Sequence, residues 1–326
     1  MEDLDEQTLS FYTRRASLGD KSSNLILGLR LMGTEGTERE GVSYIEKAFP
    51  LPQAYLCYYK YNKDQKYLVL AAEGGVKEAM YPAALYLLQI ETDVGKALTY
   101  LNIAVRNGEP DAASCLLRRY INRKEYTNAV NVFASINFQF TDELKKLSGI
   151  LDVLRGRNES NTIKYLYDHP TDIECKFYSA VHSLSKGKTE LIQQFTTSKE
   201  KIVGYENVGI TACTMLARAL KNGINGIQKD FEKAVQWYIE AEKLGFTDFF
   251  EIAECCKEAK KVELEFDYLN KAASVGCAQA MVLLAKIFIE KNTEDDKEMA
   301  SMWLDQAKEL GSEEAIHILA SLKSQS

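Results

Sequence analysis

The chain has 326 residues, and 40 lysine and arginine residues against 47 aspartate and glutamate residues give it a net charge of −7. This balance has the wrong sign for a phosphate-dominated contact and argues against a nucleic-acid partner, unless one face is locally basic. No segment approaches the ~20 apolar residues that a membrane-spanning helix needs, and the acidic amino-terminal stretch lacks the apolar core of a signal peptide. We therefore expect no membrane span and a cytoplasmic location, with the nucleus as the alternative.

The amino-terminal part, residues 12–133, is predicted to consist of helical repeats. A phrase that contains a closing glycine occurs as YLVLAAEGGVKEAM at residues 67–80 and as YLNIAVRNGEPDAA at 100–113. A partial copy, KEYTNAVNVF, follows at 124–133, and residues 12–60 hold only weaker echoes of the phrase. Recurrence at an interval of about 34 residues indicates a structural unit, because a catalytic site is built only once.

Residues 134–204 have lost this phrase. The closing glycines on either side, Gly108 and Gly245, are 137 residues apart, which is close to four repeat lengths. We therefore expect degenerate helical repeats here, and the stretch TDIECKFYSAVHSL at 171–184 has a helical pattern.

The best copies of the repeat lie at residues 205–311. In KDFEKAVQWYIEAEKLG, residues 229–245, the apolar side chains follow a helical spacing, with Asp230 as the expected N-cap and Gly245 as the expected left-handed end. The phrase returns as YLNKAASVGCAQAM at 268–281 and WLDQAKELGSEEAI at 303–316. Residues 312–326 are predicted to form a C-terminal capping helix, with Ser312 as its N-cap.

A second pattern, with alanines spaced for close helix contact, precedes the repeated phrase. It recurs at Ala79, Ala83 and Ala84, at Ala212, Leu216 and Ala217, and at Ala280, Leu284 and Ala285. Each unit is therefore predicted to be a helical hairpin that buries little surface alone and depends on stacking against its neighbours. The predicted fold class is all-α.

The combined pattern, A-x-x-x-L-A-x-x-(L/F/Y) followed by A-x-x-W-Y-x-x-A-x-x-x-G, resembles the Sel-1-like repeat family, a branch of the tetratricopeptide-like solenoids. The resemblance implies an α/α superhelical solenoid of stacked helical hairpins that forms one continuous domain, residues 1–326. It also implies a scaffold or adaptor that binds a partner peptide or protein in its concave groove and so assembles or regulates a larger complex. Two alternatives stay open, an RNA-binding helical-repeat protein and a regulatory subunit or activator of an enzyme such as a chitin synthase or a ubiquitin ligase.

Nothing in the sequence indicates a site for catalysis, a cofactor or a metal. The three histidines do not have the spacing of a catalytic triad or of metal ligands: His169, His182 and His317. No phosphate-binding or zinc-protease motif occurs, so we expect no catalytic residue, no cofactor and no metal. The seven cysteines have unequal spacing and are expected to be free thiols. A metal site is the minor alternative to buried thiols for Cys255, Cys256 and Cys277.

The candidate partner-binding residues lie on the first helix of each hairpin, which lines the concave groove in tetratricopeptide-like solenoids. Directly after the Leu-Ala pair or its equivalent come Leu85, Arg118, Arg218 and Lys286, and three of these four are basic. On an acidic chain, this row predicts a stripe that binds an acidic peptide segment or a terminal carboxylate. The predicted contact residues are Arg118, Asn122, Arg218, Lys221, Asn222 and Lys286. The alternative, ordinary solvated arginine and lysine side chains, stays open.

Overall fold

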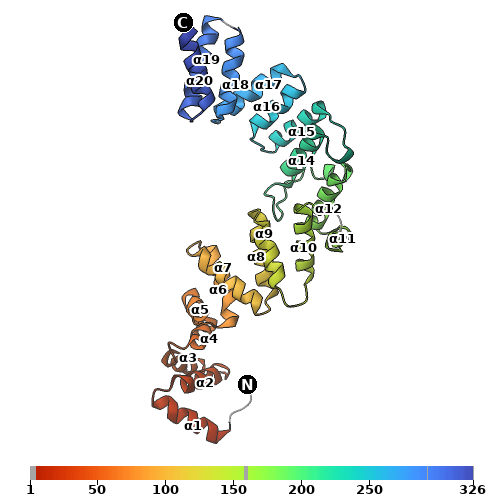
Figure 1. Cartoon of the computed structure of the whole chain (residues 1–326). Coiled ribbons are helices and arrows are strands. Elements are labelled where there is room, and N and C mark those ends of the chain that lie inside the picture. Colours follow the sequence, from red (N-terminus) through yellow and green to blue (C-terminus); the bar gives the residue numbers. More distant parts are fainter. Residues whose placement is uncertain (1–4, 158–160, 292, 326) are drawn as a thin grey trace. The chain divides into compact units, whose positions relative to one another are not determined.

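Figure 1 shows the computed structural model of the chain, which describes residues 5–157, 161–291 and 293–325. The chain divides into two compact units, Met1–Arg155 and Gly156–Ser326. The division falls inside the segment that is predicted to hold degenerate repeats. The single continuous domain stays a prediction.

The first unit is a stack of helical hairpins. Its helices are α1 (Glu6–Ser17), α2 (Lys21–Met32), α3 (Glu38–Lys47), α4 (Pro52–Asn62), α5 (Gln65–Glu73), α6 (Lys77–Gln89), α7 (Val94–Arg106), α8 (Pro110–Asn122), α9 (Tyr126–Ser135) and α10 (Asp142–Leu154). Helix α2 pairs with α3, α4 with α5, α6 with α7 and α8 with α9. Each hairpin also contacts the next one, because α3 packs on α4, α5 on α6 and α7 on α8.

The second unit has the same construction. Its elements are α11 (Asn161–Asp168), α12 (Ile173–Ser185), α13 (Glu190–Gln193), α14 (Val208–Asn222), the 3-10 turn η1 (Ile224–Gly226), α15 (Phe231–Lys243), α16 (Phe249–Glu258), α17 (Val262–Ser274), α18 (Ala278–Lys291), α19 (Glu294–Glu309) and α20 (Glu313–Gln325). The hairpins are α14–α15, α16–α17 and α18–α19, and α20 packs on α19. The backbone of the predicted capping helix is therefore present, whereas its capping role stays a prediction.

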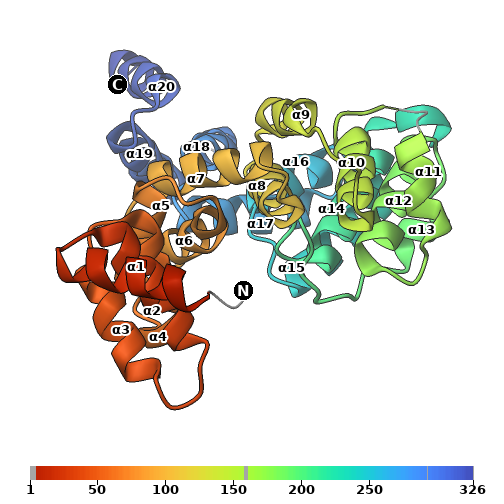
Figure 2. The same ribbon diagram turned by 90° about the horizontal axis from the view of Figure 1, so that it is seen from below.

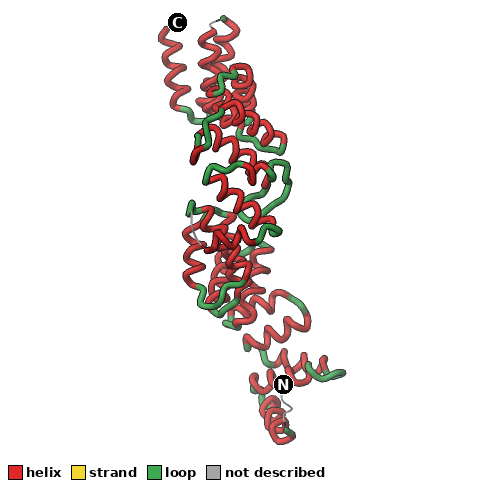
Figure 3. The backbone as a smooth tube through the Cα atoms, turned by 90° about the vertical axis from the view of Figure 1, so that its right-hand side faces the viewer, coloured by secondary structure: helices red, strands yellow, loops and turns green. Residues whose placement is uncertain are grey.

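Both units consist of helices and loops, as Figure 3 shows. In the described part of the chain, extended pairing is limited to one isolated bridge between Ile202 and Tyr205. The predicted all-α solenoid of stacked hairpins is confirmed. Among the described helices, none combines the length and the apolar character needed to span a bilayer.

Helix α15 begins and ends where its sequence predicts. Asp230 accepts a hydrogen bond from the backbone N–H of Lys233 at 3.0 Å, which satisfies a free donor of the first turn. Gly245 has a φ of +106°, a conformation that side-chain-bearing residues rarely adopt. Both predicted ends are confirmed, and they fix the length of the second helix in this repeat.

Small residues allow the helices to pack closely. Ala217 on α14, Ala241 on α15 and Ala285 on α18 are completely buried. In the first unit, a Cβ atom on Gly28 of α2 would lie 2.6 Å from Cδ1 of Ile45 on α3. A larger side chain at such positions has to displace a neighbouring helix, so the spacing of the helices depends on these residues.

The segment predicted to hold degenerate repeats, residues 134–204, contains the four helices α10 to α13. Helix α12 packs against both α11 and α13, as Figure 2 shows. The stretch after α13 is fastened to α12, because the buried Glu174 accepts the backbone N–H of Val203 at 3.0 Å and the Tyr178 hydroxyl donates to the carbonyl of Val203. The description of this segment as degenerate repeats stays a prediction.

Candidate partner-binding surface

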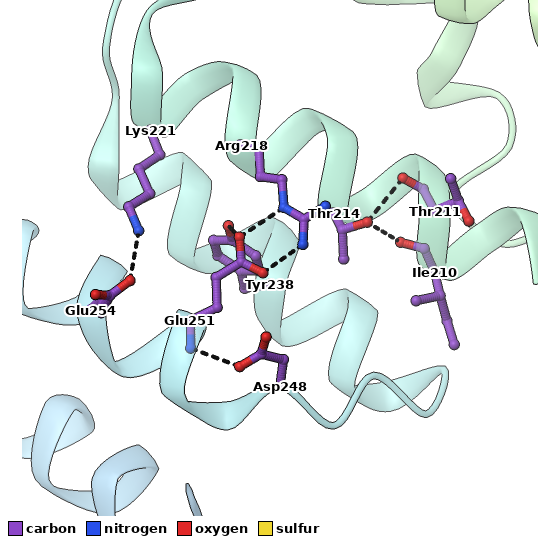
Figure 4. A network of polar contacts seen from close by, with 9 residues as sticks. All are labelled: Ile210, Thr211, Thr214, Arg218, Lys221, Tyr238, Asp248, Glu251 and Glu254. Atoms are coloured by element: carbon purple, nitrogen blue, oxygen red, sulfur yellow. Dashed lines mark hydrogen bonds and ion pairs between the residues drawn. The ribbon is translucent and has the colours of Figure 1, made fainter. Parts of the chain in front are cut away.

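The predicted contact residue Arg218 on α14 is bound by Glu251 on the next first helix, α16. Nε of Arg218 donates to Oε1 and Nη2 donates to Oε2, both at 2.7 Å (Figure 4). The hydroxyl of Tyr238, from α15, donates to the same Oε1 at 2.7 Å. Asp248 accepts the backbone N–H of Glu251 at 3.1 Å and caps α16. One carboxylate therefore joins three helices.

Burial and hydrogen bonding set the electrostatics of this cluster. The Glu251 side chain is only 18% exposed, and Tyr238 is completely buried. Burial acts to raise the pKa of Glu251, but the hydrogen bonds from Arg218 and Tyr238 outweigh it, so the pKa is lowered overall. Burial and then the Glu251 hydrogen bond raise the pKa of Tyr238, and the hydrogen bond to Glu251 raises the pKa of Arg218. Near neutral pH, the carboxylate is charged and both donors keep their protons.

The same pairing recurs at the other predicted basic residues of the second unit. Lys221 on α14 forms an ion pair with Glu254 on α16 at 3.3 Å. Lys286 on α18 pairs with Glu314 on α20 at 2.7 Å. Each of these pairs joins one first helix to a helix that lies beyond the intervening second helix.

In the first unit, the predicted residues Arg118 and Asn122 lie on α8. Nε of Arg118 donates to Oε1 of Glu143 on α10 at 2.8 Å. Glu143 also binds Lys146 of its own helix at 3.0 Å. Asn122 is the last residue of α8. All four predicted cations are thus engaged within the chain, and contact between any of them and a partner stays a prediction.

A cleft of about 400 Å³ opens beside the Lys221–Glu254 pair in the second unit. Its apolar floor consists of lining side chains that are all buried or half-buried: Phe231, Phe250, Ala253, Leu269 and Leu283. Its polar lining consists of Lys221, Asn222, Lys229, Glu254, Lys257, Glu258 and Glu265. The structure therefore places the predicted residues Lys221 and Asn222 at this cleft.

Four of the charges around this cleft are not neutralised by an ion pair with any described residue: Lys229, Lys257, Glu258 and Glu265. Three of these side chains are exposed, and Glu265 is half-buried. Asn222 is also exposed, at the end of α14. Charged groups of both signs are therefore available above an apolar floor.

Lys257 was not among the predicted residues, although it occupies the position on α16 that Arg218 occupies on α14. It follows Cys255 and Cys256, where α14 has a Leu-Ala pair. Both cysteines are completely buried and take the place of apolar side chains. Because the sequence argument located the row by its Leu-Ala pairs, it passed over this helix. The signal that reveals Lys257 is the apolar character of buried cysteine.

A comparison with protein families matches the Sel1 repeat over residues 210–246. These residues cover most of α14 and all of α15. Residues 210–246 thus match one Sel1 repeat. The predicted resemblance is thereby confirmed, and Sel1 repeat proteins are generally protein-interaction scaffolds. No curated protein sequence matches the chain.

The solved structures that are similar to this chain include the following two. One is a protective antigen present in uropathogenic Escherichia coli strains that displays an SLR fold; it is 14% identical, with a TM-score of 0.39, and the match covers 96% of this chain and 81% of that chain. The other is a Sel1 repeat protein from Oxalobacter formigenes; it is 19% identical, with a TM-score of 0.42, and the match covers 96% of this chain and 90% of that chain.

The matched Sel1 repeat contains the predicted residues Arg218, Lys221 and Asn222 and ends just before their acidic partners. Glu251 and Glu254 each lie 33 residues after the cation they bind. Sequence reasoning missed both carboxylates because it considered the basic residues of each repeat alone. An acidic residue one repeat length after a basic one, on an equivalent helix, is the signal that reveals such a pair.

Proposed function

We propose that the chain is a non-catalytic scaffold that binds a segment of a partner protein in the cleft formed by α14 to α18. The observation that carries the proposal is an apolar floor surrounded by charged side chains that have no ion pair among the described residues. Desolvation of the floor provides affinity, while charges at the rim orient the bound segment. The presence of a Sel1 repeat supports this function, because such repeats generally serve protein interaction.

The charges of the cleft favour a polypeptide over a nucleic acid. Lys229 and Lys257 are accompanied by two carboxylates, those of Glu258 and Glu265. A phosphate backbone would meet repulsion from these carboxylates, so the cleft lacks the basic surface that RNA binding requires. A peptide with side chains of both signs fits the cleft better than a purely acidic one.

The ion pairs have a supporting role in this proposal. Arg218 and Lys221 hold α14 against α16, which keeps the walls of the cleft in place before a partner arrives. A preformed site binds more tightly, because less conformational entropy is lost on binding. Direct contact then comes from Asn222, Lys229 and Lys257, while the pairs at Arg118 and Lys286 stabilise other parts of the two units.

Co-purification from an extract of the protein's own cells tests this function. The tagged full-length chain is used as bait, with and without nuclease, and the bound molecules are identified by mass spectrometry. We expect a protein partner that stays bound after nuclease treatment and whose capture weakens as salt is added. Capture that disappears with nuclease would instead support the RNA-binding alternative and contradict the proposal.

A further inference from the structure

One repeat of the second unit has a shortened second helix. In the complete repeats, α15 lies between α14 and α16, and α17 lies between α16 and α18. Helix α13 takes the equivalent place between α12 and α14, but it has 4 residues whereas α15 and α17 have 13 each. About two and a half helical turns are therefore absent from this position. The chain continues from Gln194 to Asn207 as non-helical chain that includes the isolated Ile202–Tyr205 bridge, and the carbonyl of Ser198 in this stretch accepts the backbone N–H of Gly209 on α14 at 2.9 Å.

A second cleft, of about 460 Å³, lies beside this short helix. Its apolar lining is Leu216, Leu220, Ile227 and Trp237, from α14, α15 and the loop between them. Its other side is formed by Gly187, Thr189 and Gln193, around α13, and its polar edge by Gln228, Lys229, Asp230 and Lys233. Trp237 is half-buried, and its indole N–H has no hydrogen-bond acceptor among the described residues.

One complete repeat shows a contact made by a residue in the position of Trp237. Tyr268 precedes Gly276 by the same eight residues that separate Trp237 from Gly245. Its hydroxyl donates to Glu242, on the preceding second helix α15, at 2.5 Å. In this repeat, the preceding second helix therefore supplies a carboxylate, whereas Tyr100 and Trp303, eight residues before Gly108 and Gly311, have buried polar atoms without a hydrogen-bond partner among the described residues.

Lys96, in the first unit, shows the same relationship between successive second helices. Lys96 lies twelve residues before Gly108, on α7, and forms an ion pair with Glu73 of the preceding second helix, α5. Lys233 lies twelve residues before Gly245, the same position on α15. Its ion pair is with Asp230, the N-cap of its own helix, at 2.9 Å.

Lys96 pairs with a carboxylate from the preceding second helix, whereas the ion pair of Lys233 is with its own helix. Helix α13 has one acidic residue, Glu190, which forms no ion pair with described residues and does not line the cleft. Lys229, at the same edge, also lacks an ion pair within the described ranges. Two basic side chains and an apolar floor thus line the cleft beside the shortened helix.

We propose that an amphipathic helix of a partner protein occupies this cleft and completes the repeat in place of the shortened α13. Its apolar side packs on Trp237, Leu216 and Leu220, and a carboxylate on its edge pairs with Lys233. The absent length corresponds to about nine residues, so the bound segment spans between two and three turns. A helix this short is marginal alone and becomes ordered on binding. Of its lining residues, this cleft shares only Lys229 with the cleft of the proposed function, and the inference does not depend on that function.

The chain itself provides a probe of the required chemistry. A peptide of residues 64–76, DQKYLVLAAEGGV, includes α5 and carries Glu73 in the register that pairs with Lys96. The chain has two tryptophans, so Trp303→Phe leaves Trp237 as the single indole reporter. The peptide contains no tryptophan and is titrated against this full-length variant while the emission of Trp237 is recorded.

We expect the emission of Trp237 to move to shorter wavelength as the peptide covers the indole. Either Glu73→Lys in the peptide or Lys233→Glu in the protein should weaken binding by roughly tenfold or more, because like charges then face each other. The two changes combined should restore much of the affinity, which a merely misfolded Lys233→Glu variant would not do. Lys243→Glu, on the same helix outside the cleft, serves as the control and should bind the unchanged peptide normally.

Two results would overturn the proposal. One is an unchanged Trp237 emission at saturating peptide concentrations, and the other is binding that is indifferent to both charge reversals. Sedimentation of the protein without the peptide tests whether a second copy of the chain, and not a different protein, supplies the bound helix. Self-association that shifts the Trp237 emission and is abolished by Lys233→Glu would make a second copy of the chain the occupant and would refute the assignment to a different partner.

Discussion

Glu251 on α16 receives two hydrogen bonds of 2.7 Å from the guanidinium of Arg218 on α14, a residue predicted to face a partner. The pair turns a predicted contact residue into a link between successive repeats. Because Arg218 is half exposed, its own contribution to stability is modest. The energetic weight of the cluster lies with the more deeply buried groups, Glu251 and Tyr238.

Removal of the Tyr238 hydroxyl tests this link. Tyr238→Phe keeps the ring in its packed position but deletes a hydrogen bond to a charged acceptor, so we expect a loss of about 1–3 kcal/mol in the free energy of unfolding. Urea unfolding followed by circular dichroism measures it. In a Glu251→Gln background, the same substitution should cost clearly less. Equal costs in the two backgrounds would show that the hydroxyl acts independently of Glu251.

Acid should weaken the same cluster. The pKa of Glu251 is lowered in the folded state, so its stabilising contribution is complete above the unfolded pKa of about 4.3. That contribution is lost as the pH falls through the lower, folded pKa, where the carboxylate takes up a proton. We therefore expect the difference in urea midpoint between the wild type and Glu251→Gln to shrink between pH 7 and pH 3. A constant difference would contradict this assignment.

The buried alanines should not tolerate enlargement. Ala217→Leu, Ala241→Leu and Ala285→Leu each place a large side chain at a completely buried position, and we expect each to cost about 1–3 kcal/mol. The exposed Ala320 on α20 offers a matched control, because leucine there has room. Urea midpoints of the four variants decide the matter, and unchanged midpoints for all three buried sites would refute the close packing of these hairpins.

Three cysteine thiols should be unreactive in the folded protein. Burial raises the pKa of Cys213, Cys255 and Cys256 to about 11 in each case. At pH 8, only about one such thiol in a thousand is the reactive thiolate. We expect alkylation and peptide mapping to label these three slowly in the native state and all seven after denaturation, since the structure contains seven free cysteines. Rapid native labelling of Cys255 would show that α16 opens or packs differently.

The repeat architecture followed from the sequence because the fold depends on local, recurring signals. Asp230 and Gly245 mark the two ends of α15 through backbone hydrogen bonding and a left-handed φ, which residue type alone predicts. The alanines of the first helices are a similarly direct signal in the sequence, since close helix contact requires small side chains. The shortening of α13 gave no such signal, because a weakened repeat phrase does not reveal how many helical turns remain.

The surface was harder to predict than the fold, because the state of a charged side chain depends on residues from another repeat. Arg218, Lys221 and Lys286 have the expected sequence positions, but their partners Glu251, Glu254 and Glu314 come from helices further along the chain. A pattern of basic residues does not distinguish a binding stripe from a series of ion pairs. Lys257 was not predicted because its repeat has Cys-Cys in place of the Leu-Ala pair that marks the other first helices.

The position of Lys257 also changes how the binding surface should be probed. Arg118→Glu and Arg218→Glu, the natural choice from the sequence, would set glutamate against Glu143 and Glu251 and so disturb the helix stack. We expect Arg218→Glu to lower the urea midpoint. Lys257→Glu reverses an exposed charge that has no ion pair in the described structure, so it should leave the midpoint unchanged.

Partner capture by the full-length Lys257→Glu variant, measured beside its urea midpoint, tests the central claim most directly. The control is Lys243→Glu, which reverses an exposed charge on α15 that does not line the cleft; its ion pair with Glu240 is solvent-exposed and adds little stability. The account predicts that Lys257→Glu loses most of the nuclease-resistant capture while its midpoint stays at the wild-type value, and that Lys243→Glu retains both. Undiminished capture by a fully folded Lys257→Glu variant would contradict the assignment of this cleft as the partner-binding site.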